Sequence, residues 1–80
     1  MQAARPAITG AQIRAARALL RWSVHDLSQQ CGVSESAISR AEKVDGAPAM
    51  QGRNLDAVRT ALEVHGIEFL DSTGVRIRPH

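Results

Sequence analysis

Arginine is the residue type whose number and placement in this chain best indicate a chemical task. Nine of the ten basic residues are arginine, and residues 1–21 hold Arg5, Arg14, Arg17 and Arg21 without a single acid. A guanidinium binds phosphate oxygens, or the acceptor edge of guanine, through two parallel N–H groups. The formal net charge is only +2, which by itself does not argue for a nucleic-acid partner. The distribution of arginine supports nucleic-acid binding without deciding it.

Other kinds of site chemistry find little support in the sequence. The three histidines, His25, His65 and His80, lack metal-ligand spacing, and no carboxylate pair, nucleophile with a base or phosphate-cradling glycine loop is apparent. Cys31 is the only cysteine, which excludes an internal disulfide. Its helical apolar position indicates a small buried residue, with redox sensing as the alternative. We therefore expect no enzyme activity, no metal and no cofactor.

Length and composition limit the size of the core. Eighty residues make one domain near the lower limit for a self-sufficient core, and the only aromatic residues are Trp22 and Phe69. So small a core favours a dimer interface that buries additional apolar surface. No apolar run is long enough for a signal peptide or a membrane span, so we expect a cytoplasmic protein with no membrane partner.

The stretch of residues 23–42 predicts two short helices joined by a tight turn. Ser23 and Asp26 form a variant of the capping box at the start of the first helix. Gly32 ends that helix, because glycine accepts a left-handed backbone without a Cβ penalty. Ser34 then caps the second helix. Apolar, small and glycine positions at this spacing allow two helices to cross closely through a three- or four-residue turn.

Six residues of this stretch, and the segment GVSESAISRAE, match a known motif in type and spacing. The six residues are Leu27, Ser28, Gly32, Val33, Ile38 and Glu42. Over roughly Ile8 to Leu62 the sequence resembles the Cro/repressor-type (XRE-like) helix-turn-helix family of DNA-binding regulators. The resemblance implies a mostly α, lambda-repressor-like domain of four or five helices. A helical hairpin that does not bind DNA would show the same pattern and is the alternative.

The resemblance also implies which residues read DNA. The recognition helix would span about Ser34 to Ala41 and enter the major groove with its N-terminal part. Arg40 would fork onto the O6 and N7 of a guanine, and Glu35 would accept from a cytosine amine. The alternatives are a phosphate contact for Arg40 and helix-dipole stabilisation alone for Glu35. The base-contacting candidates are Ser34, Glu35, Ser36, Ser39 and Arg40.

Phosphate contacts are implied for the flanking segments. An Arg17–Glu42 ion pair would tie the first helix to the end of the third and orient Arg17 toward a phosphate. Val24 stands where many members carry a phosphate-contacting glutamine, which puts that contact in doubt. The phosphate-contacting candidates are Arg17, Ser23, Gln29, Lys43, Arg53 and Asn54.

The flanking residues indicate where the other helices begin and end. Residues 1–8 look like a flexible arm in which Arg5 could touch a phosphate. Thr9 and Gln12 make a capping box for a helix to about Arg21. The apolar face of this helix is Ile13, Ala16, Leu19 and Leu20. Glycine and proline break the segment from Lys43 to Arg53, and Asn54 caps a last helix that runs to about His65 and stops at Gly66.

The C-terminal residues predict a β-hairpin, with strands at 67–70 and 75–78 around the turn DSTG. A lone hairpin is marginal in water, so it needs support from its own helices or from a second chain. We interpret it as a dimerisation element, with a structural cover for the helical core as the alternative. The dimerisation candidates are Ile67, Phe69, Val75 and Ile77.

These features together predict an arm (1–8), a DNA-binding domain (9–66) and a hairpin (67–80). The resemblance implies a homodimer that binds double-stranded DNA at a pseudo-palindromic operator, with half-sites roughly 34 Å apart, and most simply acts as a repressor. An antitoxin that also binds a toxin, and a protein-interaction module without DNA binding, remain the rivals. The polar recognition face favours DNA, because the same face should be apolar if it bound a protein in place of DNA.

Overall fold

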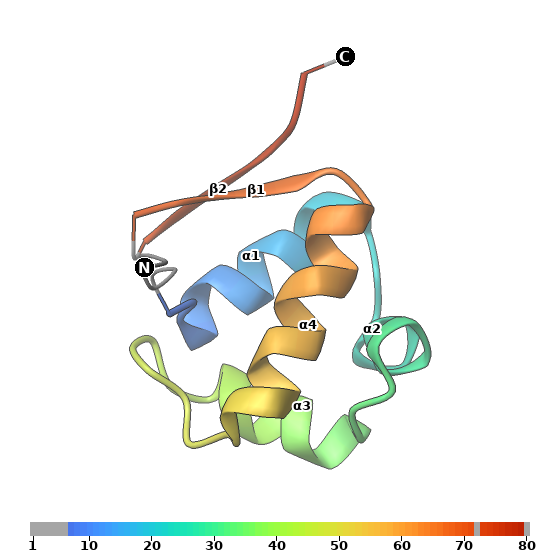
Figure 1. Cartoon of the computed structure of the whole chain (residues 1–80), viewed down its shortest axis with the longest axis vertical. Helices are drawn as coiled ribbons and strands as arrows, with labels where there is room; N and C mark the ends of the chain where they lie inside the picture. The colour runs from blue at the N-terminus through green and yellow to red at the C-terminus, as the bar shows by residue number, and fades with distance from the viewer. Residues whose placement is uncertain (1–6, 72, 80) are drawn as a thin grey trace, which may run out of the picture.

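The chain forms four helices followed by an antiparallel two-stranded hairpin, which is the mostly helical architecture that the sequence predicts (Figure 1). The computed structural model describes residues 7–71 and 73–79. The elements, in chain order, are α1 (Gly10–Leu20), α2 (Val24–Cys31), α3 (Glu35–Glu42), α4 (Gly52–Val64), β1 (Ile67–Leu70) and β2 (Gly74–Ile77). Each element except β2 contributes fully buried or nearly buried side chains to one apolar core.

Helix α1 begins with the capping box that the sequence predicts. The Thr9 hydroxyl accepts from the Gln12 backbone N–H at 3.1 Å, and the Thr9 N–H donates to Gln12 Oε1 at 2.9 Å. Ile13 and Ala16 are fully buried. The prediction that Leu19 joins this face is wrong, because its side chain is 42% exposed. The buried stripe follows steps of three and four residues along the helix, and its continuation falls on Leu20, which packs partly against the core.

The predicted N-terminal arm is too long at its C-terminal end. Ile8 is only 2% exposed and belongs to the apolar core. Burying an isoleucine contributes about 2 kcal/mol, so its position is fixed by packing. Residues 1–6, including Arg5, lie outside the described residues.

Helix α4 starts earlier than the sequence predicts. Gln51 is the residue before its first turn and Gly52 its first residue, so the prediction that Asn54 caps this helix is wrong. The entropic cost of glycine applies to the interior of a helix, and Gly52 is the first residue of α4. Among the described residues, no side chain makes a capping hydrogen bond at this end. The other end matches the prediction, since Gly66 stops the helix with a left-handed φ of 97°.

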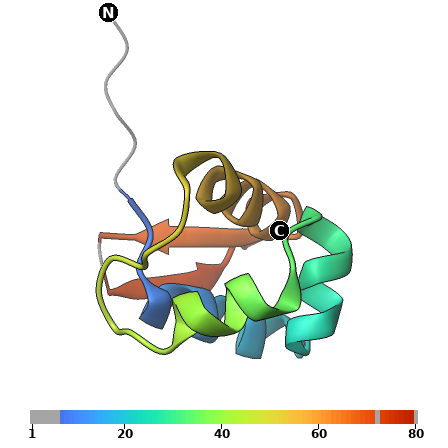
Figure 2. The ribbon, with the colours of Figure 1, turned by 90° about the horizontal axis from the view of Figure 1, so that it is seen from below.

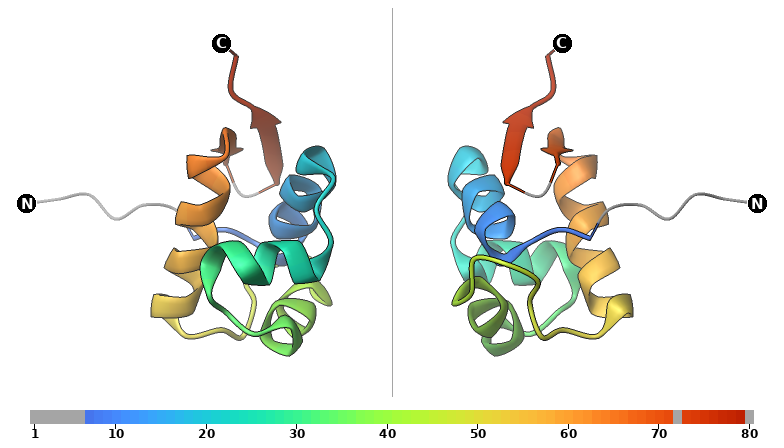
Figure 3. Two further views of the ribbon diagram at one scale, coloured as in Figure 1. Left: turned by 90° about the vertical axis from the view of Figure 1, so that its right-hand side faces the viewer. Right: turned by 90° about the vertical axis from the view of Figure 1, so that its left-hand side faces the viewer.

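The hairpin packs across the helical body of its own chain. Ile67 pairs with Ile77 and Phe69 with Val75, while β2 lies against α1 and β1 against α4 (Figures 1 and 3). Ile67 is 1% exposed and part of the core, so it is not available to a dimer interface as predicted. Phe69 and Val75 are partly buried against the same core, and Ile77 is 48% exposed. Within one chain, the hairpin therefore covers the helical core, which is the alternative to the predicted dimerisation element.

One buried polar side chain fastens the hairpin turn to α1. Gln12 is fully buried, and its Nε2 donates to the carbonyl oxygens of Leu70 (3.3 Å), Asp71 (3.0 Å) and Gly74 (3.0 Å). A buried amide that loses such partners costs about 1–3 kcal/mol. The sequence assigns Gln12 only its capping role, because its reach across 58 or more residues leaves no local signal.

Candidate nucleic-acid interface

Helix α3 lies at the opposite end of the molecule from the hairpin (Figures 1 and 3). Figure 2, which views the molecule from that end, shows α3 and the loop after it in front of α1. Ile38 and Ala41 face the core, at 0% and 2% exposure. The opposite face carries the predicted base-contacting side chains, all of which are exposed: Ser34, Glu35, Ser36, Ser39 and Arg40.

Local contacts set the angle at which α3 leaves α2. Gly32 takes the predicted left-handed conformation, with φ of 74°, and Val33 is 5% exposed between the helices. The Ser28 hydroxyl donates to the Val33 carbonyl at 2.7 Å, and Ser34 caps α3 by accepting from the Ala37 N–H at 3.2 Å. The three-residue connection is therefore fixed by a core side chain and two side-chain hydrogen bonds.

An ion pair holds the far end of α3 against α1. Arg17 donates from Nε and Nη2 to the two Glu42 carboxylate oxygens, both at 2.9 Å, and from Nη1 to the Trp22 carbonyl at 2.9 Å. Glu42 is only 8% exposed. The hydrogen bond to Glu42 raises the pKa of Arg17 above its ordinary value. This is the pair that the resemblance implied, and it directs the Arg17 guanidinium into the protein, which argues against its predicted phosphate contact.

The start of the next loop is fastened to α1 as well. Arg14 donates to the carbonyls of Glu42 and Val44 and to the Asp45 carboxylate (2.5 Å). The Gly10 N–H donates to the Gly46 carbonyl at 2.9 Å. A Cβ at Gly10 would lie 2.0 Å from the Val44 carbonyl oxygen, so only glycine fits there. No local sequence signal indicates this role for Arg14 or Gly10, because both contacts depend on how α1 crosses α3.

Beyond this anchored part, polar groups surround a groove of about 220 Å³ at the start of α4. The groove brings Arg40 of α3 next to Asn54 of α4, and Arg53 is adjacent in sequence and exposed. Arg40, Lys43 and Arg53 make no side-chain hydrogen bond or ion pair with any other described residue. Three open cations thus belong to α3, its loop and the first turn of α4. The groove is lined by Ala37, Arg40, Ala49, Met50, Gln51 and Asn54.

The two predicted phosphate contacts on the α2 side are both exposed. The Ser23 hydroxyl accepts from the Asp26 N–H at 3.0 Å as the predicted cap, and the Ser23 N–H returns a bond to the Asp26 carboxylate at 2.9 Å. The Ser23 N–H, and to a smaller extent the Ser23 hydroxyl, lowers the pKa of the Asp26 carboxyl. Gln29 makes no side-chain hydrogen bond with another described residue. The structure therefore leaves Gln29 more available to a partner than Ser23.

His25 is a neighbour of the α3 face that sequence reasoning missed. Its Nδ1 lies 2.8 Å from Glu35 Oε2, and both side chains are more than half exposed. The hydrogen bond to Glu35 raises the pKa of His25 above its ordinary value. The ten-residue separation of this pair only becomes a contact because the turn at Gly32 brings the beginnings of α2 and α3 together.

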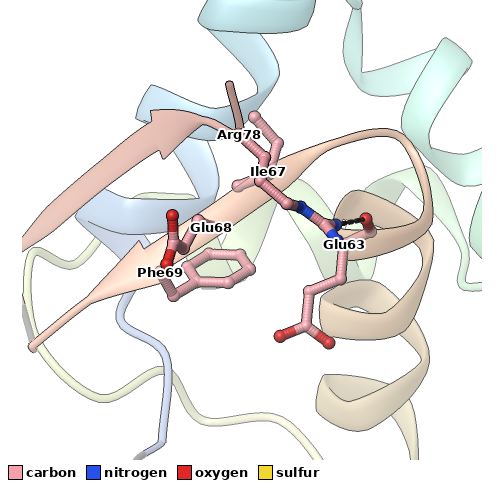
Figure 4. Close-up of a pocket in the computed structure, with 5 residues that line it drawn as sticks. All are labelled: Glu63, Ile67, Glu68, Phe69 and Arg78. Carbon is pink, nitrogen blue, oxygen red and sulfur yellow. Dashed lines mark hydrogen bonds between the residues drawn. The ribbon is translucent and has the colours of Figure 1, made fainter. Parts of the chain in front are cut away.

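A second groove, of about 340 Å³, lies between the end of α4 and β1 (Figure 4). Its charged groups are used within the chain. Arg78 donates to the Glu63 carbonyl at 2.7 Å, Arg76 pairs with Glu68 at 2.6 Å, and the Arg59 guanidinium lies over the Phe69 ring at 5.3 Å. This groove therefore offers a partner fewer open polar groups than the α3 end does.

Comparisons with known proteins add no assignment: no family model matches the chain, and no curated protein matches it. Within residues 7–71 and 73–79, no three histidine, cysteine, aspartate or glutamate side chains gather in a way that could hold a metal ion. None of the helices in this described part combines the length and apolar character needed to cross a membrane.

Proposed function

We propose that the chain binds double-stranded DNA sequence-specifically, with α3 as the recognition helix of a Cro/repressor-type helix-turn-helix. The observation that carries this proposal is the contrast between the two faces of α3. Its inner face is fixed by Ile38 and by the Arg17–Glu42 pair, whereas Ser39 and Arg40 on its outer face make no side-chain bond within the described chain. A rigid helix that presents unused donors and acceptors is suited to reading base edges.

Positive charge around α3 supports the same proposal. Arg40, Lys43 and Arg53 are exposed and open, as is Arg21 at the end of α1, whereas Arg14, Arg17 and the hairpin arginines are engaged within the chain. Open cations next to a reading surface supply the phosphate contacts that fix the register of a protein on a duplex. In this proposal Arg40 reads a guanine, and Lys43, Arg53, Asn54 and Gln29 contact the backbone. Asn54 lines the same groove as Arg40, so a phosphate bound by Asn54 would lie beside the base that Arg40 reads.

The proposed regulator acts as a homodimer, and the fold restricts how two chains could pair. The hairpin and α3 lie at opposite ends of the molecule (Figure 3). If the outward faces of two hairpins packed together, the two α3 helices would point in opposite directions. Pairing along a side of the body keeps both α3 helices facing one duplex, which a palindromic operator requires. Occupying such an operator would make the protein a repressor.

The test is the binding of purified protein to its own promoter DNA and to random duplex, over a series of salt concentrations. We expect tight, sequence-dependent binding that weakens steeply with salt, and sedimentation of two chains per duplex. Arg40→Ala should weaken specific binding by about 1–3 kcal/mol and relax the preference at one base pair. Arg76→Ala is the matched control, because Arg76 lies on the hairpin and pairs with Glu68. Weak binding that is equal on both duplexes would overturn the proposal.

A further inference from the structure

His25 and Glu35 join the beginnings of two helices. His25 is the second residue of α2 and Glu35 the first residue of α3, and Nδ1 and Oε2 are 2.8 Å apart. The pair is exposed on both sides, at 62% and 55% for the two side chains. It therefore lies on the surface that the proposed function turns toward DNA, and it contributes nothing to the buried core.

The contact with His25 leaves half of the Glu35 carboxylate available. Only Oε2 contacts the imidazole, and within the described residues Oε1 has no hydrogen-bond partner. A glutamate at the start of a helix otherwise samples several rotamers, and restricting them on binding has an entropic cost. His25 restricts them beforehand, so that Oε1 can accept from a base amine.

The charge of the pair decides whether Glu35 can approach a duplex. A lone carboxylate is repelled by phosphates, whereas a carboxylate beside an imidazolium forms a pair with no net charge. Two acids act on His25, Glu35 on α3 and Asp26 on its own helix, and both raise the pKa of His25. In the described part of the chain, α1 and α4 place no ion-pair partner on it. Phosphates of a bound duplex would act in the same direction.

We propose that His25 is the positioning residue for Glu35, and that DNA binding through α3 takes up a proton at His25. The inference rests on the proposed DNA binding. It assigns to His25 a part in base selection, because the cytosine contact of Glu35 requires a compensated and oriented carboxylate. It also makes affinity depend on pH in the range where histidine titrates.

The sign of this dependence follows from the two states of the protein. The pKa of His25 is already raised in the free protein, and in the proposed complex the nearby phosphates would raise it further. The added affinity is complete below the pKa of the free protein and is lost as pH rises toward the pKa of the complex. Because binding is coupled to the uptake of one proton, the affinity for DNA can fall by at most about tenfold per pH unit.

The experiment measures affinity for the preferred duplex from about pH 6 to about pH 8.5, at constant ionic strength, across the titration range of histidine. We expect wild-type affinity to fall as pH rises. His25→Gln should bind more weakly at low pH and show no fall, and His25→Arg should stay tight at every pH. His65→Gln is the matched control and should follow wild type, because His65 contacts Trp22 and Gln30 and not α3.

Competition between duplexes tests the positioning role separately from the charge. His25→Gln and Glu35→Gln should relax the preference at the same base pair, and His25→Arg should restore it. NMR titration of the free protein should show a lower His25 pKa in Glu35→Gln than in wild type. Specific binding that does not change with pH, or that changes equally in His25→Gln, would overturn this inference and leave the proposed function standing. Absence of specific binding at every pH would overturn both.

Discussion

The outer face of α3 and the hairpin differ in how many of their polar side chains are bonded within the chain. At the hairpin end, Gln12 satisfies three backbone carbonyls, Arg76 pairs with Glu68, and Arg78 donates to the Glu63 carbonyl. At the α3 end, Ser39 and Arg40 make no side-chain bond within the described residues. Hydrogen-bond donors without an acceptor in their own chain are available to a partner. The difference supports a structural role for the hairpin and recognition by α3.

The largest effect should come from the ion pair that holds α3 from behind. Glu42→Gln removes a carboxylate that is 8% exposed and leaves Arg17 without its bidentate partner. We expect the free energy of unfolding, measured in urea, to fall by about 3 kcal/mol. Glu35→Gln is the matched control on the same helix, and it should lower stability much less than Glu42→Gln does, because Glu35 and its partner His25 are both more than half exposed. Equal losses in the two variants would contradict the distinction between the inner and outer faces of α3.

A smaller effect is expected from the polar contact between α1 and the hairpin. Gln12→Leu keeps a similar volume but leaves the carbonyls of Leu70, Asp71 and Gly74 without their donor. The free energy of unfolding should fall by about 2 kcal/mol. Relative to wild type, exchange of the amide protons of β1 and β2 should accelerate more than exchange of those of α3. Gln29→Leu, at an exposed position of α2, should have neither effect. Unchanged exchange in the hairpin of Gln12→Leu would show that apolar packing alone holds it.

The smallest effect should be the pH dependence of the hairpin. The hydrogen bond from Arg76 lowers the pKa of Glu68. The stabilisation of the hairpin by the ionised Glu68 is therefore fully present above the ordinary glutamate pKa of about 4.3. It is lost as pH falls through the lowered pKa of Glu68 in the folded state. Amide protection of β1 and β2 should decrease slightly over that range in wild type. Glu68→Gln should abolish that decrease; a decrease of the same size in the variant would assign it to other carboxylates.

Local signals predicted most of the fold. The capping pairs at Thr9 and Ser23 and the left-handed glycines at 32 and 66 set helix boundaries through contacts of a few residues, and these predictions are confirmed. The predicted start of α4 is wrong because glycine indicates a break only in the interior of a helix, and Gly52 is the first residue of α4. Alternating residues predicted the hairpin, but they could not show whether it covers its own chain or a second one.

The candidate interface was less accessible to sequence reasoning. The exposed residues of α3 followed from helical periodicity, whereas the Arg17–Glu42 pair came from the resemblance to a family. Contacts of Arg14 with the following loop and of His25 with Glu35 depend on crossing angles between helices. Periodicity sets which face a residue occupies and carries no information about what another helix places opposite that face.

The loop after α3 consists of two parts with different tolerance to change in length. Residues 43–46 are clamped, since Gly46 and Asp45 accept from the first N–H groups of α1 and a methyl group at Gly10 would strike the Val44 carbonyl. Residues 47–49 make no such backbone hydrogen bonds to other described residues, apart from the turn in which the Met50 N–H donates to the Pro48 carbonyl. Insertions after residue 46 could therefore lengthen the loop without moving α3. A single residue inserted between 43 and 46 would instead break the contacts of this segment with the start of α1 and shift α3. Variation in this protein's lineage should concentrate in the second part.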